Sequence, residues 1–95
     1  MTKIELNNKL AELYNIDNCT YMGDRINTYL IDDWSRLMDL AVDNKLSIHI
    51  NKNDVVCVHK SYVIMAEFFD EHESPQAATR FAIAMALVKL AEDKP

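Results

Sequence analysis

Glycine and proline are scarce in this chain, which has one glycine and two prolines among 95 residues. Such a composition is typical of a regular globular domain and excludes a disordered or linker-rich chain. No apolar run approaches the roughly 20 residues of a membrane-spanning helix, and the N-terminal stretch MTKIELNNKL lacks the apolar core of a signal peptide. We therefore expect one domain over residues 1–95, located in a cytoplasm and without a membrane partner.

Basic residues and cysteines are few as well. The 10 Lys and Arg residues are outnumbered by 15 Asp and Glu residues, which gives a formal net charge of −5. A phosphate-binding surface needs clustered Lys and Arg, so nucleic acid is not the partner that this composition favours. Cys19 and Cys57 are expected to be free thiols, because a reducing compartment disfavours disulfides.

The first third of the chain predicts a helix and then a connection. Thr2-Lys3-Ile4-Glu5 has the Ser/Thr-x-x-Glu spacing of a capping box, and leucines recur behind it at helical spacing, so a helix is expected over residues 3–14. Residues 15–31 show no sustained period and hold the only glycine. They are expected to be a long connection packed across the surface.

A second helix is predicted over residues 33–45. Asp32 or Asp33 caps its N-terminus, and Asn44 is suited to a left-handed residue at its end. Trp34 begins an apolar stripe, so we expect it to anchor this helix to a sheet. The stripe consists of Trp34, Leu37, Met38, Ala41 and Val42.

Three strands are predicted over residues 46–50, 55–59 and 62–69, with a polar turn at residues 51–54. The second and third are apolar on both sides, which favours a sheet covered on both faces. We therefore expect a small α+β domain in the order α-α-β-β-β-α. Its three-stranded antiparallel sheet would carry helices on both faces, as an α/β/α sandwich.

A last helix is predicted over residues 74–92, with Ser74 as its N-cap and Pro75 at its first position. Its segment FAIAMALV is apolar on every side and must be buried all round. Either the first helix or the connection covers its outer side, or a second copy does so in a homodimer. The candidate dimer residues are Phe81, Ile83, Ala84, Leu87 and Leu90.

The stretches DDWSRLMDLAVDNKLSIHI and ESPQAATRFAIAMALVKLAE resemble the phage ABA sandwich family over about residues 32–92. The likeness consists of Asp33-Trp34 opening a helix, the passage into Ser47-Ile48-His49, and an Ala-rich closing helix. It implies an α/β/α layering and a phage or prophage origin, and it implies no catalytic residues.

The order helix–three strands–helix is also that of double-stranded RNA-binding domains, which contact phosphates through Lys at the start of the closing helix. Here that start reads Ser74-Pro75-Gln76-Ala77-Ala78, without a basic residue. Acidic residues precede it, which argues against RNA. These residues, Asp70, Glu71 and Glu73, form a candidate acidic rim for a protein partner.

Four side chains have the chemistry of metal ligands: Cys19, His49, Cys57 and His59. An even-length turn would pair Ile48 with Cys57 and place His49 on the opposite face from it, so we expect no metal site. Glu67, near His72 in sequence, is the best acid/base candidate, although an exposed rim position explains it more simply. No catalytic constellation, glycine-rich phosphate loop or cofactor motif is present in the sequence.

The sequence therefore favours a non-enzymatic phage or prophage accessory protein that binds a host or viral protein, for instance in counter-defence or host takeover. The alternative is a small-ligand or nucleotide-sequestering protein with a polar pocket near His49, His59 and Tyr62.

Overall fold

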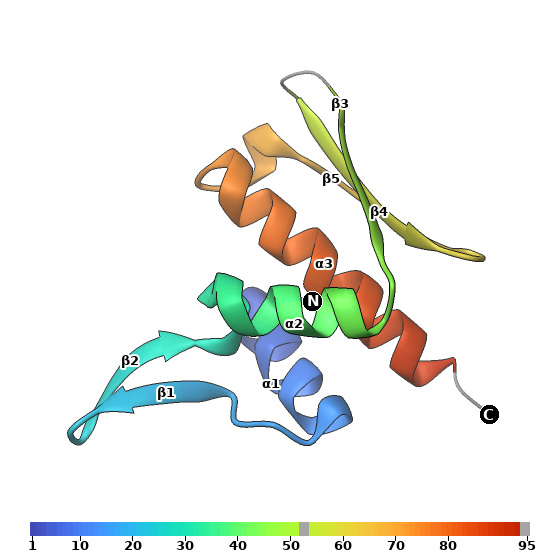
Figure 1. Cartoon of the computed structure of the whole chain (residues 1–95). Helices are drawn as coiled ribbons and strands as arrows, with labels where there is room; N and C mark the ends of the chain where they lie inside the picture. The colour runs from blue at the N-terminus through green and yellow to red at the C-terminus, as the bar shows by residue number, and fades with distance from the viewer. Residues whose placement is uncertain (52–53, 94–95) are drawn as a thin grey trace.

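Helix α3 (Pro75–Glu92) lies between a sheet and two other helices (Figure 1). The sheet consists of strands β3 (Ser47–Asn51), β4 (Val55–Lys60) and β5 (Val63–Phe68), antiparallel in that order. Helices α1 (Lys3–Tyr14) and α2 (Trp34–Asp43) pack against the other side of α3. The computed structural model describes residues 1–51 and 54–93, and these form one small α+β domain.

The predicted α/β/α sandwich is wrong, because all helices of the described residues lie on one side of the sheet (Figure 1). The inner face presents Val56, Val58 and Val63 to α3, and all three are buried. The other face, called the open face below, has no helix over it in the described chain. It comprises three cross-strand rows, Ser47–His59–Ile64, His49–Cys57–Ala66 and Asn51–Val55–Phe68.

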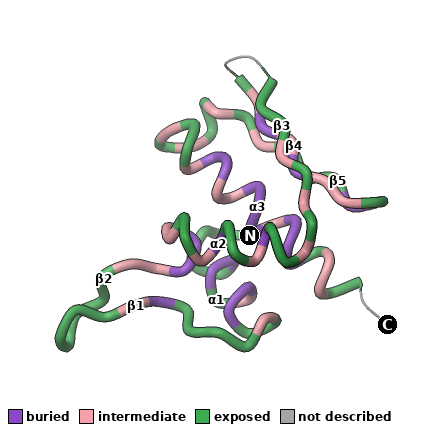
Figure 2. The backbone as a smooth tube through the Cα atoms, viewed as in Figure 1, coloured by how far each residue is buried: buried purple, intermediate pink, exposed green. Residues whose placement is uncertain are grey.

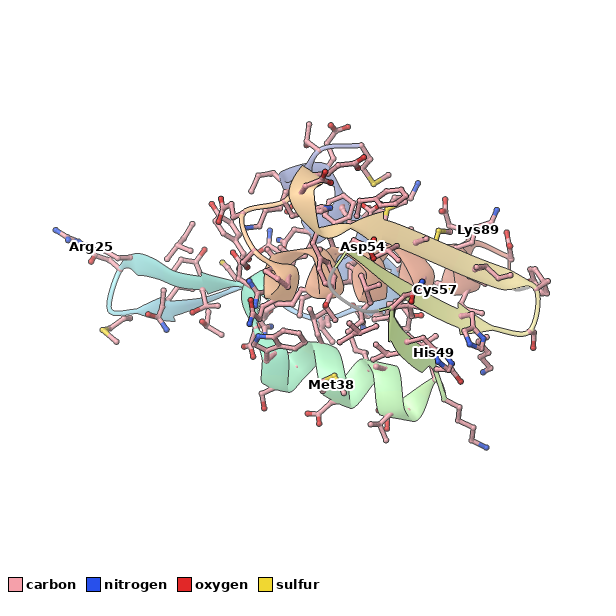
Figure 3. All side chains as sticks on the ribbon, turned by 90° about the horizontal axis from the view of Figure 1, so that it is seen from above. Arg25, Met38, His49, Asp54, Cys57 and Lys89 are labelled. Atoms are coloured by element: carbon pink, nitrogen blue, oxygen red, sulfur yellow. The ribbon has the colours of Figure 1, made fainter. Side chains whose placement is uncertain are left out.

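Residues 15–31, expected to be an irregular connection, contain a β-hairpin instead. Strand β1 (Cys19–Met22) pairs antiparallel with β2 (Arg25–Tyr29), and a short helical turn, η1 (Leu30–Asp32), leads into α2. Gly23 occupies the first central position of the two-residue turn with φ +68°, a conformation that glycine adopts without steric cost. Figure 3 shows Arg25 at the far end of this hairpin, which projects away from the rest of the chain.

The helix starts follow the capping rules read from the sequence. Thr2 and Glu5 form the reciprocal capping box at α1. Asp33, rather than Asp32, caps α2. The Ser74 hydroxyl accepts a hydrogen bond from the backbone N–H of Ala77 at 3.0 Å.

The end of α2 differs from the prediction. Asn44 has φ −93°, and the left-handed residue is Lys45, with φ 56°. The Lys45 N–H donates to the Val42 carbonyl and the Leu46 N–H to the Ala41 carbonyl, both at 3.0 Å. This is the Schellman pattern, in which the left-handed residue lies one position beyond the cap.

Helix α3 forms the centre of the core, which explains its all-round apolar sequence. Leucines from α1, valines from β4 and the middle of α3 are buried together, as the purple positions of Figure 2 show. The Tyr14 hydroxyl of α1 also donates a 2.7 Å hydrogen bond to the Leu87 carbonyl of α3. The outer side of α3 is covered by the chain itself, through α1, α2 and the η1 turn at the end of the 15–31 segment.

The candidate dimer residues are buried or partly buried within the chain. Ile83, Ala84 and Leu87 are fully buried inside a single chain, so they are not surface residues that a second copy can contact. Phe81 and Leu90 are partly buried and pack against the same core. The predicted assembly surface on α3 is therefore occupied by α1, α2 and the sheet.

Candidate functional site

A pocket of about 300 Å³ lies where the starts of α1 and α3 meet η1 and the short helical turn η2 (Phe69–Glu71). Its charged lining contains four carboxylates against one ammonium group. The carboxylates belong to Asp32, Asp70, Glu71 and Glu73, and the ammonium group to Lys3. The candidate acidic rim predicted from the sequence therefore borders a pocket.

Local structure positions the acidic rim. The η2 turn redirects the chain after β5, and the Phe69 N–H is bonded to the Asp54 carbonyl at 2.8 Å. Ser74 then starts α3, so the rim residues immediately precede a helix N-terminus, where negative charge is favoured by the helix dipole.

The far side of the pocket comes from much earlier parts of the chain, Lys3 of α1 and Ile31 and Asp32 of η1. Lys3 Nζ and Asp32 Oδ1 form an ion pair at 2.8 Å, which neutralises one carboxylate of the lining. Among the described residues, Asp70, Glu71 and Glu73 take part in no ion pair. All three are exposed, so the mouth of the pocket carries uncompensated negative charge.

An aromatic ring and two aliphatic side chains complete the lining. Phe81 is partly buried and lies beside His72, with ring centroids 5.0 Å apart and a 48° angle between the rings. Ile31 and Ala77 add apolar surface. The pocket therefore combines an apolar wall with an acidic mouth.

Glu67 is less exposed than the rim position expected from the sequence. Its side chain is 23% exposed, and its Oε1 lies 3.0 Å from Nε2 of His72, which is 16% exposed. Glu67 thus orients an imidazole that lines the pocket. A carboxylate–histidine pair is also found in acid/base sites. Such a pair acts only on a substrate group within hydrogen-bonding distance of the imidazole.

The predicted strand register was wrong by one residue. His49 pairs with Cys57 and not with Val56. The side chains of His49 and Cys57 therefore lie on the same face of the sheet as that of His59. Part of the predicted turn, residues 52–53, lies outside the described residues, and Asn51 belongs to β3. Figure 3 shows His49 and Cys57 on neighbouring strands.

The shared face does not create a metal centre. The imidazoles of His49 and His59 stack with centroids 5.0 Å apart and 11° between their planes. Within residues 1–51 and 54–93, no group of three or more His, Cys, Asp or Glu is arranged to hold a metal ion. Cys19 is buried and Cys57 partly exposed, and both are free thiols.

Trp34 does not anchor α2 to the sheet, as the apolar stripe had suggested. It is 38% exposed, and the guanidinium carbon of Arg80 on α3 lies 5.1 Å from its ring centroid. Helix α2 packs on α3 through the buried Leu37 and Ala41, while Val42 stays exposed. The tryptophan instead borders a shallow groove of about 190 Å³ with Ile50 and Phe69.

Sequence reasoning found the acidic rim but missed the residues that turn it into a pocket. Lys3 was considered only within a capping box, and Asp32 was considered as a helix cap and not as part of the acidic rim. No local signal connects them to the rim, because the contact arises from packing between α1, η1 and α3.

These features define a small α+β domain with an acidic pocket. No family model, curated protein or solved structure matches the chain. None of the helices in the described part of the chain has the length and apolarity needed to cross a membrane.

Proposed function

We propose that this protein acts by binding, and that the acidic pocket receives a Lys or Arg side chain from a protein partner. The observation that carries the proposal is the position of three carboxylates without ion pairs in the described chain, Asp70, Glu71 and Glu73, at the mouth of a pocket with an apolar wall. Basic side chains have this dual character, with an aliphatic stem and a charged end.

The dimensions and charges support this class of ligand. The pocket volume of about 300 Å³ is at the lower limit of ligand pockets, which suits one side chain better than a large cofactor. The stem of a lysine or arginine would lie along Phe81, and its charged end would meet Glu71 and Glu73. An arginine would add planar, bidentate hydrogen bonding to a carboxylate.

Nucleotide sequestration, the alternative, has less support at this site. Phosphate groups would face Asp70, Glu71 and Glu73 at close range, and like charges repel. The histidines expected to line a nucleotide pocket, His49 and His59, lie on the open face, away from these residues. A phage or prophage origin and a role in counter-defence or host takeover are proposals that rest on the sequence resemblance alone.

The test uses fluorescence anisotropy with labelled peptides that carry one central Arg or Lys between apolar residues. The double variant Glu71→Gln/Glu73→Gln is compared with Asp39→Asn/Asp43→Asn, which removes the same charge from exposed positions of α2. We expect the pocket variant to weaken binding at least about tenfold, or 1.4 kcal/mol, and the α2 variant to change it less than about twofold. Equal losses in both variants, or no binding at millimolar peptide, would contradict the proposal.

A further inference from the structure

We propose that His72 links occupation of the acidic pocket to pH, so that the pocket binds a basic side chain while this imidazole is neutral and releases it when the imidazole is protonated. This role of His72 rests on the proposed function, because it concerns the same pocket and the ligand class assigned to it there. It adds a residue that selects between an empty and an occupied pocket, which the acidic rim by itself does not do.

The imidazole of His72 has a fixed place in the pocket wall. Its Nε2 lies 3.0 Å from Oε1 of Glu67 on β5, and its ring lies 5.0 Å from that of Phe81 on α3. His72 and Phe81 both line the pocket. A change in the charge of this imidazole therefore occurs in the wall that a bound side chain would contact.

The contact with Glu67 determines what the two ring nitrogens of His72 can do. An ionised carboxylate only accepts hydrogen bonds, so Nε2 carries a proton and donates it to Glu67. In the neutral imidazole, Nδ1 is then an acceptor. The head groups of Lys and Arg carry donors and no acceptor, so they can bond to Nδ1 of the neutral ring. Protonation makes Nδ1 a donor and removes this bond.

The charge of the imidazole acts in the same direction. Carboxylates favour a proton on His72 and a cationic ligand alike, and the two positive charges repel each other at close range. The α3 residues of the pocket, Ala77 and Phe81, are uncharged. The charged groups around His72 are Glu67 from β5, Asp70 and Glu71 from η2, Glu73 before α3, and the ion-paired Asp32 of η1 and Lys3 of α1.

The pH range separates this effect from loss of the acidic rim. Histidine is the side chain that ordinarily changes charge between about pH 5 and 8. Carboxylic acids ordinarily titrate near pH 4. A loss of affinity between about pH 8 and 5.5 therefore occurs while the carboxylates of the pocket remain largely ionised.

The experiment measures anisotropy of the labelled Arg and Lys peptides with the full chain at about pH 8 and about pH 5.5. Wild type should bind about tenfold more weakly at the lower pH, as expected when one proton and the ligand exclude each other. His72→Gln should bind with similar affinity at both pH values. His59→Gln is the matched control, because His59 is also partly exposed but lies on the open face, and it should retain the dependence of wild type.

Two further measurements do not depend on the folding of His72→Gln. Calorimetry of wild type near pH 6.5, in buffers that differ in ionisation enthalpy, should show that peptide binding releases a fraction of one proton. Glu67→Gln keeps an acceptor for Nε2 of His72 but removes the negative charge beside the ring. The loss of affinity in this variant should therefore begin at a lower pH than in wild type.

The outcomes distinguish the role of His72 from the proposed function. Wild-type binding that is equal at both pH values, or an equal pH dependence in His72→Gln, would overturn the role of His72 and leave the proposed function intact. Peptide binding without proton release near about pH 6.5 would do the same. No peptide binding at about pH 8, where the imidazole is ordinarily neutral, would overturn both.

Discussion

Asn7 and Ile31 are joined by a 2.8 Å hydrogen bond in which the Ile31 N–H donates to Oδ1 of Asn7. The Asn7 side chain is fully buried, and its Nδ2 donates to the Asn18 carbonyl at 2.9 Å. Asn18 precedes β1 and Ile31 follows β2. One amide of α1 therefore holds both ends of the projecting hairpin, and η1 with them, against the core.

The first prediction concerns this amide. Asn7→Ala should lower the free energy of unfolding by about 2–3 kcal/mol, because it leaves the buried Ile31 N–H without its partner and also removes the part-buried bond to the Asn18 carbonyl. Asn8→Ala is the control, since Asn8 is exposed and bonds only the Asn18 side chain among the described residues, and it should cost less than about 1 kcal/mol. Urea unfolding measures both, and equal losses would contradict the assignment.

The second prediction concerns Asp33 and acid. Burial opposes ionisation of Asp33, but hydrogen bonds from the Arg36 backbone N–H and guanidinium outweigh it, so the pKa of this carboxyl is lowered from 3.8. A lowered pKa in the folded state stabilises the fold above pH 3.8, and this contribution is lost as the pH falls through the folded pKa. Asn at this position keeps the cap without the charge.

Asp33→Asn should therefore be less stable than wild type at neutral pH, and the difference should shrink as the pH falls below 3.8. Urea midpoints measured across the acid range give the comparison. A difference that stays constant over this range would show that the charge of Asp33 does not stabilise the fold.

The third prediction concerns the packing around α3. Ala86 is fully buried, whereas Ala91 near the end of the helix is partly exposed. Ala86→Leu should lower the free energy of unfolding by about 1–3 kcal/mol through overpacking, and Ala91→Leu should change it by less than about 0.5 kcal/mol. Thermal and urea unfolding measure the pair. Equal effects would mean that the middle of α3 has free space or a free face.

The fourth prediction concerns Lys45, whose φ of 56° is unfavourable for a residue with a Cβ. Lys45→Gly should raise the free energy of unfolding by about 0.5–1 kcal/mol, because glycine adopts the left-handed conformation without steric cost. Lys45→Ala keeps the unfavourable conformation and should be close to wild type. A stabilisation by alanine as large as that by glycine would assign the effect to the lysine side chain instead.

Part of the fold could be read from the sequence because its signals are local. The capping box at Thr2 and Glu5 and the Ser74-Pro75 helix start depend on residues within one helical turn of each other. Strands β3, β4 and β5 follow from runs of alternating or continuous apolar residues. The hairpin was missed although Gly23-Asp24 is a recognised two-residue turn pair, because its strands lack a regular apolar pattern.

The candidate site was predictable only in part. Asp70, Glu71 and Glu73 are close in sequence, so an acidic cluster was visible in the chain. Their combination with Lys3 and Asp32 in one pocket depends on how α1 and η1 pack against α3. The register of His49 and Cys57 was likewise set by the length of the turn between β3 and β4, which the sequence does not specify.

The sequence by itself determined the helix starts and the need to bury FAIAMALV on every side, because local hydrogen bonding and the arrangement of apolar residues decide these features. Only the tertiary structure decided where the helices lie. Strands that are apolar on both sides favour cover on both faces, but the sequence does not say which face the helices cover. Here α1 and α2 stack behind α3, since α3 is itself apolar all round and needs their surface, and the described chain leaves the open face of the sheet without a helix over it.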